Sequence, residues 1–147
     1  MRYGIAQCNK YADKNDLMVT AIENDVDVLL FPELIDLTKT FDYGIITGSG
    51  YKEWTFKKKP YNSYEIVKES VLLNYRKQNM FPGYDDEHEP GKTMPHTFID
   101  GKKVYVCICY DIRNPWIFKQ MEKPDIIIIP AEFPAERIED WKRLLIS

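Results

Sequence analysis

The feature that most constrains the fold is an alternation of short, β-branched apolar runs with segments of helical periodicity. The apolar runs lie at residues 3–7, 26–31, 103–108 and 126–129, and the helix-like segments at 13–24 and 115–120. This order predicts an α/β fold. With 147 residues, of which 44% are hydrophobic, the chain can form a single domain over residues 1–147 with a core of its own.

Turn residues divide the rest of the chain. We expect a strand over 43–47 that is closed by the glycines at 48 and 50, and a β pattern over 69–76. Asp100-Gly101 predicts a tight hairpin, because glycine adopts positive φ without a Cβ clash. A helix is expected to start at Pro134 with an apolar stripe made by Ile138, Trp141, Leu144 and Leu145. The irregular segment 81–91 is expected to be a loop that borders a site.

Charge and cysteine content exclude several functional classes. The chain has 20 Lys and Arg against 23 Asp and Glu, a net charge of −3, which gives no strong attraction for nucleic acid or an acidic membrane. No run approaches the roughly 20 apolar residues of a membrane span, and no signal peptide is apparent, so a cytoplasmic protein is expected. The three cysteines, Cys8, Cys107 and Cys109, are an odd number without C-x-x-C spacing, which predicts free thiols and no metal site.

Three residues with reactive side chains each directly follow an apolar strand: Glu33, Lys77 and Cys109. Groups beyond the carboxyl ends of neighbouring strands in an α/β sheet converge on one crevice. Each residue alone has a more ordinary explanation, since a cysteine in a strand is usually a small core residue and a charged residue after a strand is usually on the surface. The three together favour a catalytic site.

The local sequences around these residues resemble the motifs of the nitrilase superfamily of carbon-nitrogen hydrolases. They are Phe31-Pro32-Glu33, Tyr75-Arg76-Lys77 and Cys109-Tyr110-Asp111-Ile112-Arg113, and the last is similar to the amidase branches. The resemblance implies an αββα sandwich and hydrolysis of a small linear amide or carbamoyl compound without metal or cofactor. Cys109 would be the nucleophile that forms a thioester, Glu33 the general base, and Lys77 the stabiliser of the tetrahedral intermediate.

The resemblance also implies supporting residues. The backbone N–H of Tyr110 would help to hold the oxyanion, and a loop glutamate, Glu87 with Glu89 as the alternative, would orient Lys77. Glu132 stands where an asparagine is common, and we expect it to bind the substrate and to favour an amine-bearing one.

A papain-like Cys-His site would need His88 or His96, neither of which lies in a recognisable signature. We expect Cys107 to lie on the same face of the strand as Cys109 but deeper in the protein. We interpret Cys107 and Cys8 as structural residues.

The resemblance further implies that the family domain extends beyond Ser147, so the sandwich is expected in a reduced form. An open sheet edge with exposed apolar surface would then favour a homo-oligomer. Two functions remain open from the sequence: an amidase-like hydrolase, or a catalytically inactive remnant or interaction protein of the same fold.

Overall fold

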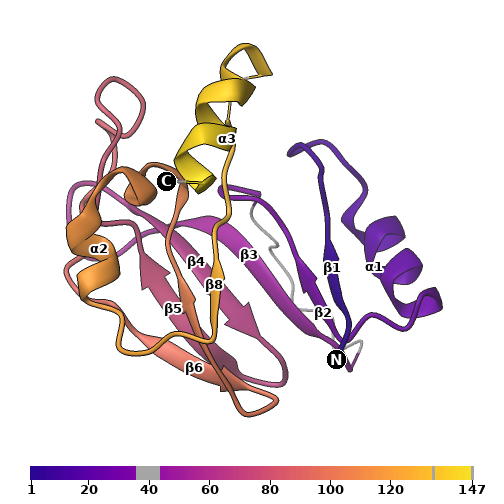
Figure 1. Cartoon of the computed structure of the whole chain (residues 1–147). Helices are drawn as coiled ribbons and strands as arrows, with labels where there is room; N and C mark the ends of the chain where they lie inside the picture. Colours follow the sequence, from indigo (N-terminus) through magenta and orange to yellow (C-terminus); the bar gives the residue numbers. More distant parts are fainter. Residues whose placement is uncertain (36–43, 134, 147) are drawn as a thin grey trace.

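Two β-sheets lie face to face in the computed structural model of the protein, which describes residues 1–35, 44–133 and 135–146 (Figure 1). The first sheet has the order β1-β2-β3-β4-β5, with parallel pairing from β1 to β3 and antiparallel pairing from β3 to β5. Its strands are β1 (Tyr3–Ile5), β2 (Val28–Leu30), β3 (Ile46–Glu53), β4 (Tyr61–Val67) and β5 (Val71–Arg76). The second sheet has the order β6-β7-β8, made of β6 (His96–Ile99), β7 (Lys102–Val106) and β8 (Ile126–Ile128).

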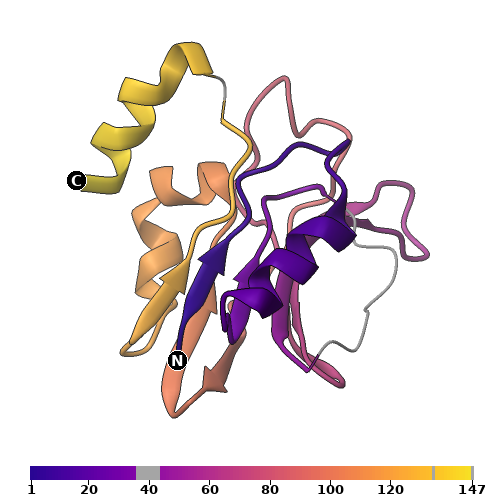
Figure 2. The same ribbon diagram turned by 90° about the vertical axis from the view of Figure 1, so that its right-hand side faces the viewer.

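Helices cover the outer faces of both sheets, so the layers run α, β, β, α (Figures 1 and 2). Helix α1 (Lys14–Glu23) packs Met18 and Ala21 onto the first sheet, and α2 (Pro115–Lys119) packs Ile117 onto the second. The remaining helical segments are η1 (Cys109–Arg113), η2 (Ala135–Arg137) and α3 (Ile138–Ile146). The αββα sandwich expected from the sequence is confirmed.

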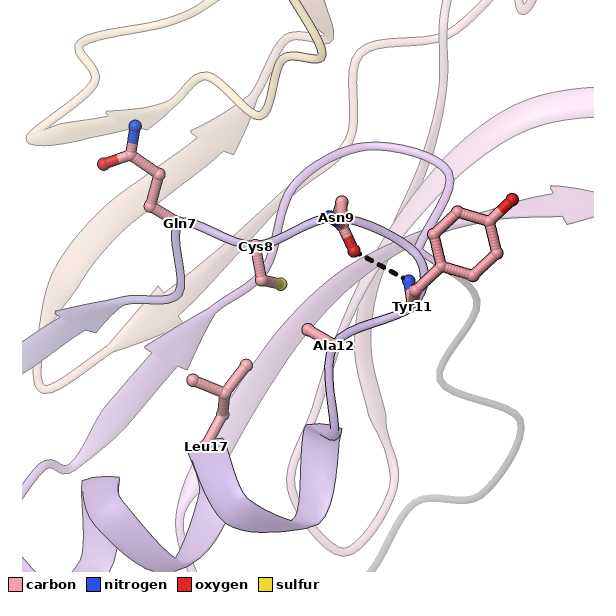
Figure 3. Close-up of a pocket in the computed structure, with 6 residues that line it drawn as sticks. All are labelled: Gln7, Cys8, Asn9, Tyr11, Ala12 and Leu17. Carbon is pink, nitrogen blue, oxygen red and sulfur yellow. Dashed lines mark hydrogen bonds between the residues drawn. The ribbon is translucent and has the colours of Figure 1, made fainter.

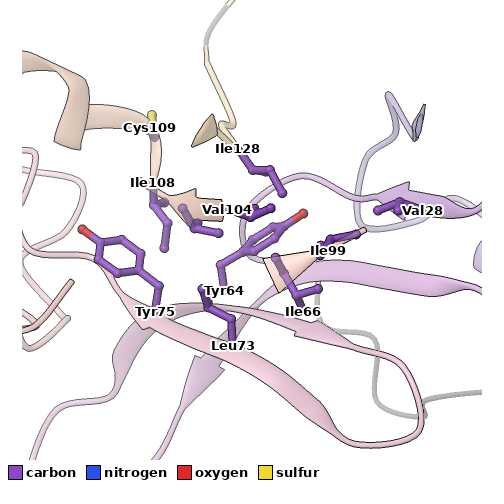
Figure 4. Packing of buried hydrophobic residues seen from close by; sticks show 11 residues of the cluster. Val28, Tyr64, Ile66, Leu73, Tyr75, Ile99, Val104, Ile108, Cys109 and Ile128 are labelled. Carbon is purple, nitrogen blue, oxygen red and sulfur yellow. The ribbon is translucent and has the colours of Figure 1, made fainter. Parts of the chain in front are cut away.

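The inner faces of the two sheets share one apolar core (Figure 4). From the first sheet Tyr64, Ile66 and Tyr75 contribute, and from the second Val104 and Val106, all with 2% exposure or less. Burying an aliphatic or aromatic side chain of this size stabilises a fold by roughly 1.5–3 kcal/mol. This shared core fixes the distance between the sheets.

Local sequence explains where the helices begin. Asp13 caps α1, because its carboxylate accepts hydrogen bonds from the N–H groups of Asn15 and Asp16. Asn114 caps α2 in the same way, and Pro115 follows at the first helical position, where a missing N–H costs nothing. Within the described residues no helix is long and apolar enough to cross a bilayer.

The expectation that β3 ends at Gly48 is wrong, since the strand continues to Glu53. The glycines permit close approach of neighbouring groups inside the strand. A Cβ at Gly48 would lie 2.8 Å from the Tyr64 hydroxyl oxygen, and one at Gly50 would lie 2.5 Å from the backbone nitrogen of Leu34. Tyr43, where the strand was expected to begin, lies outside the described residues.

Other expectations are confirmed with shifted boundaries. The hairpin forms at Asp100-Gly101, where both residues have positive φ. The β pattern expected from residue 69 begins at Val71. The C-terminal helix is preceded by η2, and Trp141 packs on Phe133 with ring centroids 5.0 Å apart. Pro134, its expected first residue, lies outside the described part of the chain.

We predict that Gly50→Ala destabilises the protein by about 2 kcal/mol or more, because the added methyl group collides with backbone and not with a flexible side chain. Urea unfolding measures the loss. Gly101→Ala is the matched control: its φ is +70° but no atom lies within 4 Å of the added Cβ, so about 1 kcal/mol of backbone strain is expected. Equal losses for the two variants would contradict the close-approach argument.

Candidate active site

Glu33, Lys77 and Cys109 meet at one end of the sandwich, as the sequence predicted. They follow β2, β5 and β7, and Glu33 lies close enough to Cys109 for its charge to act on the pKa of the thiol. Lys77 Nζ lies 3.7 Å from Glu33 Oε2. All three line a cavity of about 440 Å³. The other lining residues are Leu34, Phe81, Tyr84, Asp85, Tyr110, Glu132, Phe133 and Arg137.

Glu33 is held in place by three segments of the chain. The segment after β2 runs beside β3, with the Phe31 N–H donating to the Gly48 carbonyl. The buried carboxylate accepts from the Asn62 side-chain amide at 3.1 Å through Oε2 and from the Glu132 N–H at 2.8 Å through Oε1. Both oxygens therefore have neutral donors, which fixes the orientation of the carboxylate towards Lys77 and Cys109.

Lys77 is only 3% exposed and sits between two carboxylates. Its Nζ lies 2.8 Å from Asp85 Oδ2. Burial by itself lowers the pKa of Lys77, but the charge of Glu33 and the hydrogen bond and charge of Asp85 outweigh it, so that the pKa is raised. The amine is therefore an ammonium ion at neutral pH.

The acidic residue beside Lys77 is Asp85, and neither of the expected glutamates takes this place. Glu87 has 63% of its side chain exposed and pairs with Lys52 at 2.7 Å, and Glu89 pairs with Lys57 at 3.3 Å. The cause is a turn in the loop, in which the Asp85 N–H donates to the Phe81 carbonyl and the Phe81 N–H donates to Asp85 Oδ2. The turn directs the acidic side chain at 85 inward, two positions earlier than Glu87.

Cys109 is not the end of the strand but the first residue of η1, with φ of +45°. This conformation is uncommon for a residue with a side chain and is often found at functional sites. It is held by the Cys109 N–H, which donates to the Pro130 carbonyl, and by buried Asp111, which accepts from the Ile108 N–H and the Tyr75 hydroxyl. The turn aims the thiol into the cavity.

The electrostatic environment keeps the Cys109 thiol protonated. Burial, followed by the negative charge of Glu33, raises its pKa well above the ordinary value, although the ammonium of Lys77 opposes the shift. Thiolate formation therefore needs the proton to move to a neighbouring group as the sulfur reacts.

The other two cysteines lie elsewhere. Cys107 packs with Ile117 beneath α2, in a cluster separate from the inter-sheet core that Cys109 contacts, so the expected shared face is wrong. The positive φ of Cys109 breaks the strand alternation. Cys8 lies in the turn between β1 and α1, where Asn9 Oδ1 accepts from the Tyr11 N–H (Figure 3).

Besides Glu33, Lys77, Cys109 and Asp85, two more charged residues line the cavity, and the sequence predicted only one of them. Glu132 lines the cavity as expected and has an exposed side chain. Arg137 also lines it, with Nε 3.2 Å from Asp140 Oδ2 and its guanidinium over the Phe133 ring. In the sequence Arg137 is only one residue of a helical segment, and its spacing from Glu132 does not indicate that the two line one cavity. Among the described residues no cluster of His, Cys, Asp and Glu could hold a metal ion.

A four-layer sandwich with a buried Glu, Lys and Cys at one cavity defines the class of carbon-nitrogen hydrolases. The model of the carbon-nitrogen hydrolase family matches residues 4–147, and the chain belongs to this family. It is 29% identical over 164 aligned positions to 2-oxoglutaramate amidase of Bacillus subtilis (strain 168), covering 91% of this chain and 63% of the relative. The chain thus spans less than two thirds of that protein.

Solved structures share the fold. A mutant of the Nesterenkonia AN1 amidase from the nitrilase superfamily superposes with a TM-score of 0.79 at 16% identity, over 99% of this chain and 68% of that one. Another mutant of that amidase, with a TM-score of 0.74, 16% identity and the same coverage, shows covalent addition of the acetamide moiety of fluoroacetamide at the active-site cysteine.

We predict that the pH at which Cys109 becomes alkylated depends on the charges of its two neighbours, Glu33 and Lys77. In wild type, iodoacetamide should react with Cys109 only at alkaline pH. Glu33→Gln removes a negative charge that disfavours the thiolate, so the midpoint should move to lower pH, whereas Lys77→Gln should move it higher. Peptide mass spectrometry resolves the thiols.

Cys107 is the internal control for that experiment, because burial raises its pKa to about 12 and it should stay unmodified in every variant. A midpoint that rises in Glu33→Gln would refute the assigned electrostatics.

Proposed function

We propose that the protein hydrolyses the carbon-nitrogen bond of a small linear amide through a thioester on Cys109. The observation that carries the proposal is the buried arrangement of thiol, carboxylate and ammonium at one cavity, 9%, 5% and 3% exposed. These are a nucleophile, a proton carrier and a fixed positive charge, the three groups that amide cleavage needs.

The reaction begins when Glu33 takes the thiol proton as the sulfur attacks the carbonyl carbon. The ammonium of Lys77 and the backbone N–H of Tyr110 stabilise the resulting oxyanion. The C–N bond then breaks, and Glu33 gives its proton to the departing nitrogen, which leaves as ammonia or amine. Glu33 next takes a proton from water as the oxygen attacks the thioester, and the C–S bond breaks. Glu33 returns that proton to the sulfur, and the carboxylic acid is released.

Asp85 acts in this scheme as the residue that positions Lys77. Its Oδ2 holds the lysine Nζ at 2.8 Å, shorter than the 3.7 Å distance to Glu33. The lysine is thereby kept from a close ion pair with Glu33, which leaves that carboxylate available to receive the thiol proton.

The relatives support this chemistry. The Bacillus subtilis relative is a 2-oxoglutaramate amidase, and the Nesterenkonia amidase carries a covalent adduct on its active-site cysteine. The homo-oligomer and the cytoplasmic location expected from the sequence stay predictions.

We predict that the wild-type protein releases ammonia from at least one amide of a small linear panel, and that Cys109→Ala abolishes release, because no other thiol lines the cavity. A coupled ammonia assay measures this, and intact mass after rapid quenching should show an acyl adduct on wild type only. Cys8→Ala is the matched control and should keep full activity. No release from any amide, with an unmodified thiol, would instead support the inactive remnant.

The charged residues at the cavity indicate which groups the substrate carries at the end opposite its amide. We propose that Arg137 pairs with a carboxylate and Glu132 with an ammonium, as on the ω-amide of an α-amino acid. Three amides allow the two contacts to be tested separately. L-glutamine carries both groups, 4-carbamoylbutanoate lacks the ammonium, and 4-aminobutanamide lacks the carboxylate.

We predict that Arg137→Gln lowers kcat/KM about 5-fold for the two carboxylate-bearing amides and leaves 4-aminobutanamide unchanged. The effect is modest because the side chain of Arg137 is 47% exposed. Glu132→Gln should have the complementary pattern. Arg143→Gln, on α3 but away from the cavity lining, is the control. Equal losses on all three amides would disprove the charge pairing.

A further inference from the structure

His88 lies directly behind Asp85 and has no role in the scheme above. It is 4% exposed, and neither ring nitrogen has a hydrogen-bond partner among the described residues. Nδ1 lies 3.7 Å from Asp85 Oδ1, and Nε2 lies 4.0 Å from Glu87 Oε1. Buried polar groups are nearly always paired, so an imidazole with two unpaired nitrogens calls for an explanation.

We propose that His88 is a positioning residue that donates its Nδ1–H to Asp85 Oδ1 and so fixes the carboxylate that holds Lys77. The inference rests on the proposed function. Asp85 uses Oδ2 for Lys77 and for the Phe81 N–H, which leaves Oδ1 facing the imidazole. Hydrogen bonds of catalytic groups are often long in the free enzyme and shorten in the substrate complex.

The surroundings of the ring select one protonation state. Four charged groups face it: Asp85 and Glu87 from its own loop, Lys52 from β3, and Lys77 after β5. Burial, the largest influence, lowers the pKa of His88, and the two lysines add to this effect against the two carboxylates. The ring is therefore neutral at pH 7 and carries one N–H.

That N–H belongs on Nδ1. A hydrogen on Nε2 would turn the Nδ1 lone pair towards the buried carboxylate of Asp85, with repulsion in a region of low dielectric. Glu87 has less need of a donor, because it is exposed and already bonded to Lys52. Lys77, Asp85, His88 and Glu87 thus form a row from the cavity to the surface, with Glu87 at its outer end.

The kinetic test uses three single histidine variants and a comparison of His88→Leu in the Asp85→Asn background. We expect His88→Leu to lower kcat about 10-fold with little change in KM, as for other residues that orient a reacting group. His88→Asn, which keeps an N–H near the Nδ1 position, should recover most of that loss. His96→Leu is the matched control, since His96 is the other histidine and lies exposed on β6. In the Asp85→Asn background, His88→Leu should have no further effect.

A second readout does not depend on turnover. Nitrogen NMR of the His88 ring in the wild-type protein at pH 7 should show the neutral Nδ1–H tautomer, and Asp85→Asn should shift its resonances. The Nε2–H tautomer, an unchanged kcat in His88→Leu, or an equal loss in the Asp85→Asn background would each overturn the assignment. If no amide is hydrolysed, the proposed function fails, while the tautomer still decides the role of His88.

Discussion

A buried ammonium between two buried carboxylates is the interaction on which the rest of the site depends. Lys77, Glu33 and Asp85 are each 5% exposed or less, and they come from the end of β5, the end of β2 and the loop after β5. Removing one partner of a buried ion pair typically costs about 3–5 kcal/mol, because a charge is left without compensation. The three segments therefore cannot move independently. Neutral donors from Asn62 and the Phe81 N–H add to Lys77 at Glu33 Oε2 and Asp85 Oδ2, and the Glu132 N–H donates to Glu33 Oε1.

This charge set also explains the state of Cys109. Two carboxylates and one ammonium already sum to −1, and a thiolate would add a second uncompensated negative charge in a buried place. The raised pKa of the thiol follows from this balance. In the reaction proposed above, sulfur becomes negative only as Glu33 takes the proton and the new C–S bond moves charge onto the carbonyl oxygen. Under that proposal, Lys77 stabilises the charge at the stage where it is delocalised towards the substrate.

The sequence predicted the residues that follow strands, and it did not predict those whose position depends on the path of a loop. Glu33, Lys77 and Cys109 come after apolar runs, so strand direction alone carries them to one end of the sheets. Asp85 was missed in favour of Glu87 because a turn closed by Asp85 itself decides which acidic residue points inward. The sequence also did not predict that β3 continues past Gly48 and Gly50, because the groups that approach these glycines closely are distant in sequence.

The site also depends on the core, since the triad is divided between the two sheets. Glu33 and Lys77 follow strands of the first sheet, whereas Cys109 follows β7 of the second. Two core tyrosines reach from the inter-sheet core to the site: the Tyr64 hydroxyl donates to the Phe31 carbonyl at 2.8 Å, and the Tyr75 hydroxyl donates to Asp111 at 2.7 Å. Asp111 in turn holds the turn that presents the thiol. The separation of sulfur from carboxylate is therefore set by how tightly the two sheets pack, and a well-packed core is a condition for the chemistry as well as for stability.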